Sequence, residues 1–317
     1  MTSLNRRNFL KNTSALSAGI FLPFPKLSFF NAPERRFKIS LAPSAIGVKL
    51  NQRETLQKAQ EYGFEAFTAS PAELAAMSSA ERKEFQNEMK SKNLSWDTAG
   101  LPVQFRDTAE IFQKDLKELP RLAAALQDAG VAGTNTWIMP THKELTYREN
   151  FKQHAERLGE VATILGDHNL KLGLEYVGPK TLMASQRFSF VRTMKELKEL
   201  IAEIGKQNVG IQLDSFHWFC AEETPEDIRS LDKNEIITCD LNDAKAGRSP
   251  AEQIDSQREL PGHSGVIDLK SFIGALLDIG YDGPVRAEPF NKELNEMDDD
   301  QALAVTFKAM KNTVTNV

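Results

Sequence analysis

The chain has 317 residues, of which 41% are hydrophobic and 26% charged, and its formal net charge at pH 7 is −5. This length is enough for one barrel of eight parallel strands, which typically takes about 250 residues, or for two smaller domains. The composition is that of an ordinary soluble globular protein, and the negative charge argues against a nucleic-acid-binding protein, which would usually carry a basic stripe. The two cysteines, Cys220 and Cys239, provide no disulfide framework.

The first 32 residues have a different sequence pattern from the rest of the chain. Residues 5–11 read NRRNFLK, and a moderately apolar stretch follows over residues 13–24. This pattern resembles a bacterial twin-arginine export signal, although a basic amphipathic helix is an alternative interpretation. The stretch is too short for a transmembrane helix and no cysteine follows it, so no stable membrane anchor is expected. We therefore predict an export signal and leader over residues 1–32 and a periplasmic location for the folded protein.

After residue 36, short apolar runs alternate with longer amphipathic segments. Glycines at positions 63, 130 and 280 are predicted to end helices, because a left-handed C-cap favours glycine. Eight strand–helix units without a glycine-rich dinucleotide fingerprint favour a closed barrel over an open sheet. No composition shift divides residues 33–317, which we predict to form a single α/β domain, a (β/α)8 TIM barrel. The predicted strands are residues 37–41, 66–69, 94–99, 133–139, 170–176, 209–214, 236–241 and 284–288, and the clearest helices are residues 72–92, 109–129, 143–169 and 189–206.

Four acids lie near the ends of the last four predicted strands: Glu175, Asp214, Asp240 and Glu288. The carboxyl ends of barrel strands open onto one face, so these acids are expected to converge on one pocket. Carboxylates a few ångströms apart repel one another strongly unless protons or a cation offset the charge. With His217 three residues after Asp214, the set suits a divalent metal ion, and the dominance of carboxylates favours Mn²⁺ or Mg²⁺, with Co²⁺ or Zn²⁺ as alternatives.

A simpler interpretation exists for each of these residues. Any one acid could cap the helix that follows it or pair with a lysine, and His217 could pack at the rim. All four acids at matching strand ends are harder to explain in that way, so the arrangement indicates an enzyme.

The stretches 173–179 (GLEYVGP), 213–218 (LDSFHW), 241–244 (LNDA) and 280–288 (GYDGPVRAE) resemble the xylose-isomerase-like barrel family of sugar isomerases and epimerases. The resemblance covers about residues 37 to 313. It implies metal ligands at Glu175, Asp214, Asp240 and Glu288. It also implies that His217 and Arg258 contact the substrate.

Two departures from the family pattern matter. The family usually has histidine where this chain has Asp240, which makes the implied metal site all-oxygen and favours Mn²⁺ or Mg²⁺ over Zn²⁺. The loop that often reads Leu-Pro-Gly-acid-Gly has His263 in place of the acid, and we expect this residue to contribute to substrate choice.

The resemblance implies an isomerase or epimerase that removes a proton next to a carbonyl and passes through an enediolate. Glu175 and Glu288 would exchange the proton, and Trp137 and Trp218 could offer apolar faces to a sugar. The expected substrate is a sugar, keto sugar or cyclitol without phosphate. A lyase or hydrolase acting on keto-glycosides stays open, as does a non-catalytic sugar-binding protein. A homo-oligomer is also open, but no surface pattern requires one.

Overall fold

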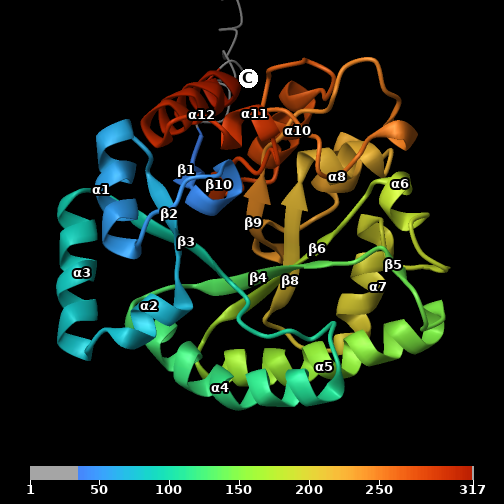
Figure 1. Cartoon of the computed structure of the whole chain (residues 1–317), viewed down its shortest axis with the longest axis horizontal. Helices are drawn as coiled ribbons and strands as arrows, with labels where there is room; N and C mark the ends of the chain where they lie inside the picture. The colour runs from blue at the N-terminus through green and yellow to red at the C-terminus, as the bar shows by residue number, and fades with distance from the viewer. Residues whose placement is uncertain (1–34, 316–317) are drawn as a thin grey trace, which may run out of the picture. The chain divides into compact units, whose positions relative to one another are not determined.

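The computed structural model describes residues 35–315, all within the unit Pro33–Val317. Eight parallel strands close into one barrel, with helices around it (Figure 1), so the predicted fold is confirmed. Around the barrel each strand pairs with the next, and the last pairs with the first. The barrel strands are β1 (Lys38–Leu41), β2 (Ala66–Ala69), β3 (Ser95–Gly100), β4 (Gly133–Ile138), β6 (Lys171–Tyr176), β8 (Val209–Asp214), β9 (Ile236–Asp240) and β10 (Pro284–Arg286).

Side chains alternate between the two faces of each barrel strand. On β6 and β8, the fully buried Leu174 and Leu213 belong to the main apolar core. The opposite face of the barrel strands includes polar residues. On β9, for example, Thr238 donates a 3.0 Å hydrogen bond to Asp97 of β3. Because β3 and β9 are not neighbours in the barrel, this bond crosses its interior. The barrel lumen is therefore polar and hydrogen-bonded, unlike the layer between strands and helices.

The main helices follow the barrel strands, as their amphipathic sequences predict. In α4, for instance, Phe112, Leu119 and Leu126 recur at seven-residue spacing and are all buried. The helices are α1 (Gln52–Tyr62), α2 (Pro71–Ala76), α3 (Ser79–Ser91), α4 (Ala109–Asp128), α5 (Tyr147–Asp167), α6 (Lys180–Met183), α7 (Met194–Ile204), α8 (Ser215–Cys220), α9 (Pro225–Arg229), α10 (Leu269–Asp278), α11 (Lys292–Asn295) and α12 (Asp299–Thr315).

The predicted helix over residues 72–92 is wrong in one respect, since the structure divides it into α2 and α3. Ser78 interrupts it by acting as the N-cap of α3. Its hydroxyl accepts a hydrogen bond from the backbone N–H of Glu81, whose carboxylate accepts one from the N–H of Ser78. This capping box starts a new helix where the apolar pattern alone suggested continuity.

Two short features lie outside the expected alternation. Strands β5 (Thr141–His142) and β7 (Phe188–Ser189) form a separate antiparallel pair.

The glycines expected to end helices behave as predicted, since Gly63, Gly130 and Gly280 all have positive φ. Within residues 35–315, no helix is long and apolar enough to cross a membrane. The predicted export signal lies outside the described residues.

Candidate active site

The carboxyl ends of β6, β8, β9 and β10 bring four carboxylates together. Asp214 and Asp240 end their strands, Glu175 is the last residue but one of β6, and all three are buried. Glu288 lies two residues beyond β10, with a side chain that is 22% exposed. Asp214 and Asp240 are direct register partners on β8 and β9. The strand ends therefore place the four acids as the barrel argument predicted.

Arg258, in the long loop after β9, is the main cation among these acids. Its guanidinium donates to Asp214 at 2.8 Å, to Asp255 at 2.8 Å and to Glu288 at 3.3 Å. It is only 2% exposed. Ion pairs buried to this degree are strong only when their hydrogen bonds are complete, as they are here. The arginine thus links the loop to two of the strand-end acids.

His217 sits in the first turn of α8, which begins directly after β8. Its Nε2 lies 3.8 Å from the Glu175 carboxylate and 4.0 Å from that of Asp214. The backbone N–H of Gly178 faces its Nδ1 at 3.3 Å, and the Arg258 guanidinium faces its Nε2 at 3.1 Å. Burial and the neighbouring Arg258 charge lower the pKa of His217 to about 3, so the imidazole is neutral at physiological pH.

Gly178 shows why the loop after β6 needs a glycine. A Cβ at this position would lie 2.3 Å from the carbonyl oxygen of His217. No side chain fits so close to another backbone. The glycine therefore allows the β6 loop to rest directly on α8, which fixes the position of His217 beside Glu175.

The carboxylates strongly perturb one another. Burial, followed by the charges of Glu288, Asp214 and Asp240, raises the pKa of Glu175 well above its usual value. Burial and the Asp240 charge raise the pKa of Glu288 to about 8, whereas burial opposed by Arg258 raises that of Asp214 only to about 6. Carboxyl groups with displaced pKa values in one cleft are typical of catalytic sites.

Part of this cluster fits a divalent metal ion. Glu175, Asp214 and His217 each offer one ligand atom, and these atoms all lie within 4.8 Å of one another. Two carboxylate oxygens and an imidazole nitrogen are an ordinary donor set for such ions. A cation would also offset the repulsion that raises the carboxyl pKa values, because Glu175, Asp214, Asp240 and Glu288 outnumber Arg258 and Arg286.

Asp240 is engaged by other groups. Arg286, its register partner on β10, donates from Nε to its Oδ1 at 2.7 Å. Gln212 donates to its Oδ2 at 2.7 Å and to Glu175 at 3.2 Å. Asp240 also lies outside the three-residue ligand group. The structure places it as the support of Gln212 and Arg286 beneath the site.

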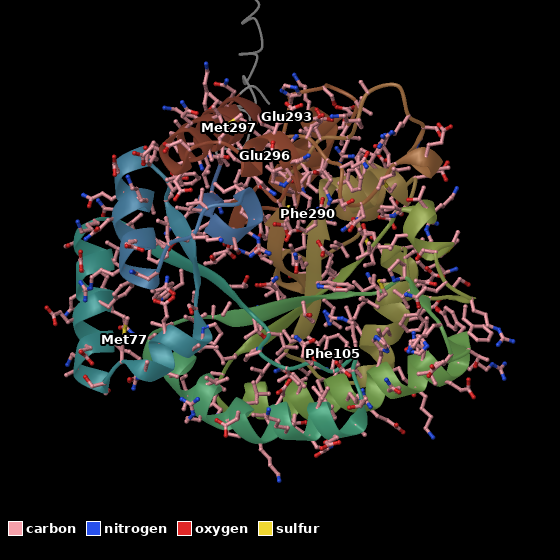
Figure 2. All side chains as sticks on the ribbon, viewed as in Figure 1. Met77, Phe105, Phe290, Glu293, Glu296 and Met297 are labelled. Carbon is pink, nitrogen blue, oxygen red and sulfur yellow. The ribbon has the colours of Figure 1, made fainter. Side chains whose placement is uncertain are left out.

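A cavity of about 500 Å³ opens over this cluster. A volume of this size holds a monosaccharide or a small cyclitol. Trp137, which is 44% exposed, contributes to its wall together with Gln212, and Arg106 and Asp255 are polar members that strand alternation does not predict. Phe290, labelled in Figure 2, lines it beside Arg258, 4.5 Å from the guanidinium carbon to the ring centroid.

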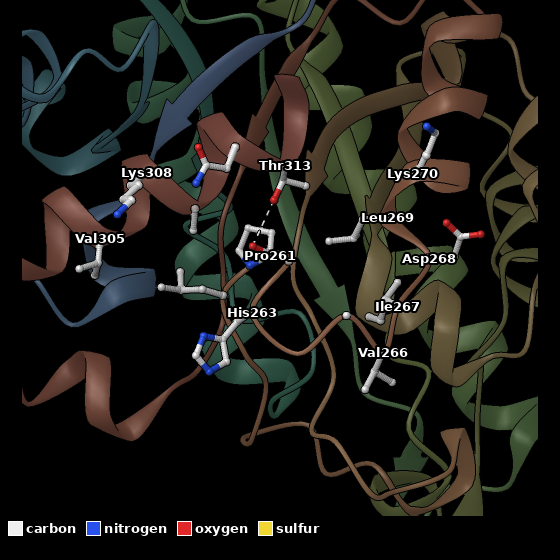
Figure 3. Close-up of a pocket in the computed structure, with 15 residues that line it drawn as sticks. Pro261, His263, Val266, Ile267, Asp268, Leu269, Lys270, Val305, Lys308 and Thr313 are labelled. Atoms are coloured by element: carbon white, nitrogen blue, oxygen red, sulfur yellow. Dashed lines mark hydrogen bonds between the residues drawn. The ribbon is translucent and has the colours of Figure 1, made fainter. Parts of the chain in front are cut away.

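Two predicted substrate contacts are corrected by the structure. Trp218 is only 5% exposed, donates from its indole N–H to the carbonyl of Thr224 and packs edge-on against Phe272 of α10. Asp214 ends the strand, so a helical period replaces the alternation of β8 and turns Trp218 away from the cavity. His263 lines a different hollow, between its own loop and α12 (Figure 3). The N–H groups of Ser264 and Gly265 donate to the Asp243 carboxylate, which holds the loop in that place.

The comparisons with known proteins agree with this architecture. The family model described as Xylose isomerase-like TIM barrel matches residues 56–312. The inosose isomerase of Bacillus subtilis (strain 168) is 26% identical over 176 residues, which is 55% of this chain and 60% of that protein. The match thus spans less than two thirds of that relative's length.

Solved structures extend the similarity over more of the chain. A xylose isomerase domain protein from Alicyclobacillus acidocaldarius has a TM-score of 0.76 and 26% identity, covering 88% of this chain and 98% of that one. The IolI protein with a bound zinc atom has a TM-score of 0.72 and shares the fold at 21% identity, covering 88% of this chain and 99% of that one. Because the family model covers most of the sequence, the chain belongs to the Xylose isomerase-like TIM barrel family.

Proposed function

We propose that this protein is a divalent-metal-dependent isomerase or epimerase of a keto sugar or cyclitol, with Mn²⁺ or Mg²⁺ as the ion. The observation that carries the proposal is the pair Glu175 and Glu288, whose pKa values are both raised, on the wall of one cavity with His217 and Arg258. The similarity to inosose isomerase supports the same class of reaction.

The residues would act on a hydroxyketone substrate by moving one proton. A bound divalent ion would polarise the carbonyl and adjacent hydroxyl oxygens and so acidify the neighbouring C–H bond. One of the two glutamates removes that proton as a general base, and the electron pair of the C–H bond moves into the carbonyl to give an enediolate. Return of a proton to the same carbon from the opposite face gives the epimer, and its return to the neighbouring carbon gives the isomer.

Other side chains would position the substrate. Arg258 lines the cavity and orders the acids around it, because its N–H groups donate to Asp214, Asp255 and Glu288. Gln212 also holds Glu175 and Asp240 at a fixed separation. Trp137 offers an apolar ring face of the kind that sugars pack against.

Product analysis tests this proposal. The metal-stripped protein, resupplied with Mn²⁺ or Mg²⁺, should convert at least one member of a panel of ketoses and inososes into an epimer or isomer that chromatography resolves. The same samples with a chelator should give no product. Tight sugar binding without conversion of any panel member would favour a sugar-binding protein instead.

The metal site gives a prediction about pH. Addition of Mn²⁺ to the stripped protein should raise the melting temperature, and more at pH 8 than at pH 6. The raised pKa values of the ligands Glu175 and Asp214 mean that the ion competes with protons for these carboxylates, and that this competition is stronger at pH 6 than at pH 8. Apparent affinity should rise about tenfold per pH unit for each proton released. Asp214→Asn should remove the effect, and a gain that is larger at pH 6 would contradict the proposed ligands.

Export by the twin-arginine route belongs to the proposal and depends on the sequence of residues 5–11 alone. Replacing Arg6 and Arg7 together by lysine should retain the full-length protein in the cytoplasm of a bacterial host that has this pathway. Cell fractionation measures the outcome. Unchanged release into the periplasm would contradict the assignment of the signal.

A further inference from the structure

Arg106 stands apart from the other arginines that surround the cavity. It lies in the loop between β3 and α4, is half-buried and lines the cavity that contains Glu175. Arg258 and Arg286 have carboxylate partners at hydrogen-bond distance. Within residues 35–315, no carboxylate oxygen lies within 4.0 Å of the Arg106 guanidinium. Its only side-chain partner there is the hydroxyl of Thr136, at 3.3 Å from both terminal nitrogens.

The nearest acids along the chain do not neutralise it. Asp107 accepts a hydrogen bond from the backbone N–H of Thr108 at 2.7 Å, and Asp115 accepts one from the N–H of Gln104 at 2.9 Å. Burial lowers the pKa of Arg106 to about 10, and no neighbouring negative charge offsets the effect. A half-buried guanidinium without an acid is costly, so its place on a cavity wall points to a ligand that supplies the charge.

Aromatic rings hold this guanidinium in a defined orientation. Its central carbon lies 4.0 Å from the ring centroid of Trp137 and 4.4 Å from that of Phe105, which is labelled in Figure 2. Trp137 is the register partner of Glu175 on the neighbouring strand. A planar guanidinium stacked on rings keeps its edge free for two parallel hydrogen bonds. The unpaired cation therefore stacks on β4, the strand next to the one that carries the proposed base, in the same cavity.

We propose that the substrate of this site carries a carboxylate that Arg106 binds, so that it is a keto acid of the sugar or cyclitol type. This assignment rests on the proposed function. A single guanidinium matches the single charge and planar shape of a carboxylate better than a doubly charged phosphate. Elsewhere in the cavity, Glu175 and Glu288 would repel an anion, which fixes the direction in which such a substrate enters.

Binding measurements on a matched series test the proposal. Fructose, fructuronate and fructose 6-phosphate differ only at carbon 6, as a hydroxymethyl, carboxylate or phosphate ester. Calorimetric titration of each into the Mn²⁺-loaded protein gives an affinity that does not depend on detecting a product. Charge-assisted hydrogen bonds predict that fructuronate binds about 10- to 100-fold more tightly than fructose. Arg106→Met should erase this preference while leaving fructose affinity within about threefold.

Two further variants make the result specific. Arg106→Lys should retain part of the preference, because it keeps the charge but loses the planar fork. Arg121→Met, on the exposed surface of α4, should behave as the unchanged protein. Equal affinity for fructose and fructuronate, tighter binding of the phosphate, or no measurable binding of fructuronate would each overturn the proposal. Selective binding of fructuronate without solvent deuterium exchange would support the anion site and instead contradict the proposed function.

Discussion

Product formation should fall by about 10³-fold or more when Glu175 or Glu288 is replaced by glutamine, because neither variant can then move a proton at that position. Glutamine keeps the size and much of the hydrogen bonding of glutamate, so the Gln212 contact to residue 175 can persist through the amide. The rate with saturating Mn²⁺ and substrate is the measurement. Both carboxyl groups are predicted to be needed, since one removes the proton and the other returns it.

Controls separate proton transfer from folding and from metal binding. Glu156→Gln, on the exposed face of α5, should keep the full rate. Glu288 lies outside the three-residue ligand group, so Glu288→Gln should keep its Mn²⁺ affinity, whereas Glu175→Gln should weaken it. Activity of either active-site variant within tenfold of the unchanged protein would contradict the assigned base.

Arg286→Met should destabilise the barrel by about 3–5 kcal/mol, because it leaves two buried carboxylates without their cation. The Arg286 guanidinium donates to Asp240 at 2.7 Å and lies 3.6 Å from the Asp97 carboxylate, and all three residues are buried. Urea unfolding at pH 7 in the presence of a chelator measures the free energy of unfolding. The double variant with Asp240→Asn should recover part of the loss.

A surface arginine is the matched control for this change. Arg121 pairs with Glu118 where both side chains are more than half exposed, and exposed pairs of this kind contribute about 0–1 kcal/mol. Arg121→Met should therefore lower stability by less than about 1 kcal/mol. If Arg286→Met lowered the free energy of unfolding by an equally small amount, the hydrogen bonds inside the barrel would not depend on the ion pair between Arg286 and Asp240.

Much of this architecture was readable from the sequence. All eight predicted strands occur, and four acids at strand ends do meet at one mouth, because both features follow from local period and from the shared direction of parallel strands. The contacts of Asp240 were harder to predict from the sequence. Its position at the end of β9 predicts the location, but only the β9–β10 register brings Arg286 onto its carboxylate.

The residues that sequence reasoning missed or misplaced depend on loops and on breaks in period. Arg106 lies in a loop without periodicity, and its lack of an acidic partner is a three-dimensional property. Trp218 was expected at the barrel mouth, but the change from strand to helix at Asp214 turns its side chain away from the cavity and against Phe272 of α10. His263 follows the outward turn that the Asp243 hydrogen bonds impose on its loop.

Solvent deuterium exchange shows whether this site removes a carbon-bound proton from a substrate. The Mn²⁺-loaded protein in D₂O is mixed with ketoses, inososes and fructuronate, and the carbon-bound protons are followed by NMR beside Glu175→Gln and a chelated sample. We expect deuterium uptake at the carbon next to the carbonyl of at least one substrate, and its loss in the variant and with the chelator. Conversion of a substrate without any deuterium uptake, or uptake that persists in Glu175→Gln, would contradict proton abstraction by this site.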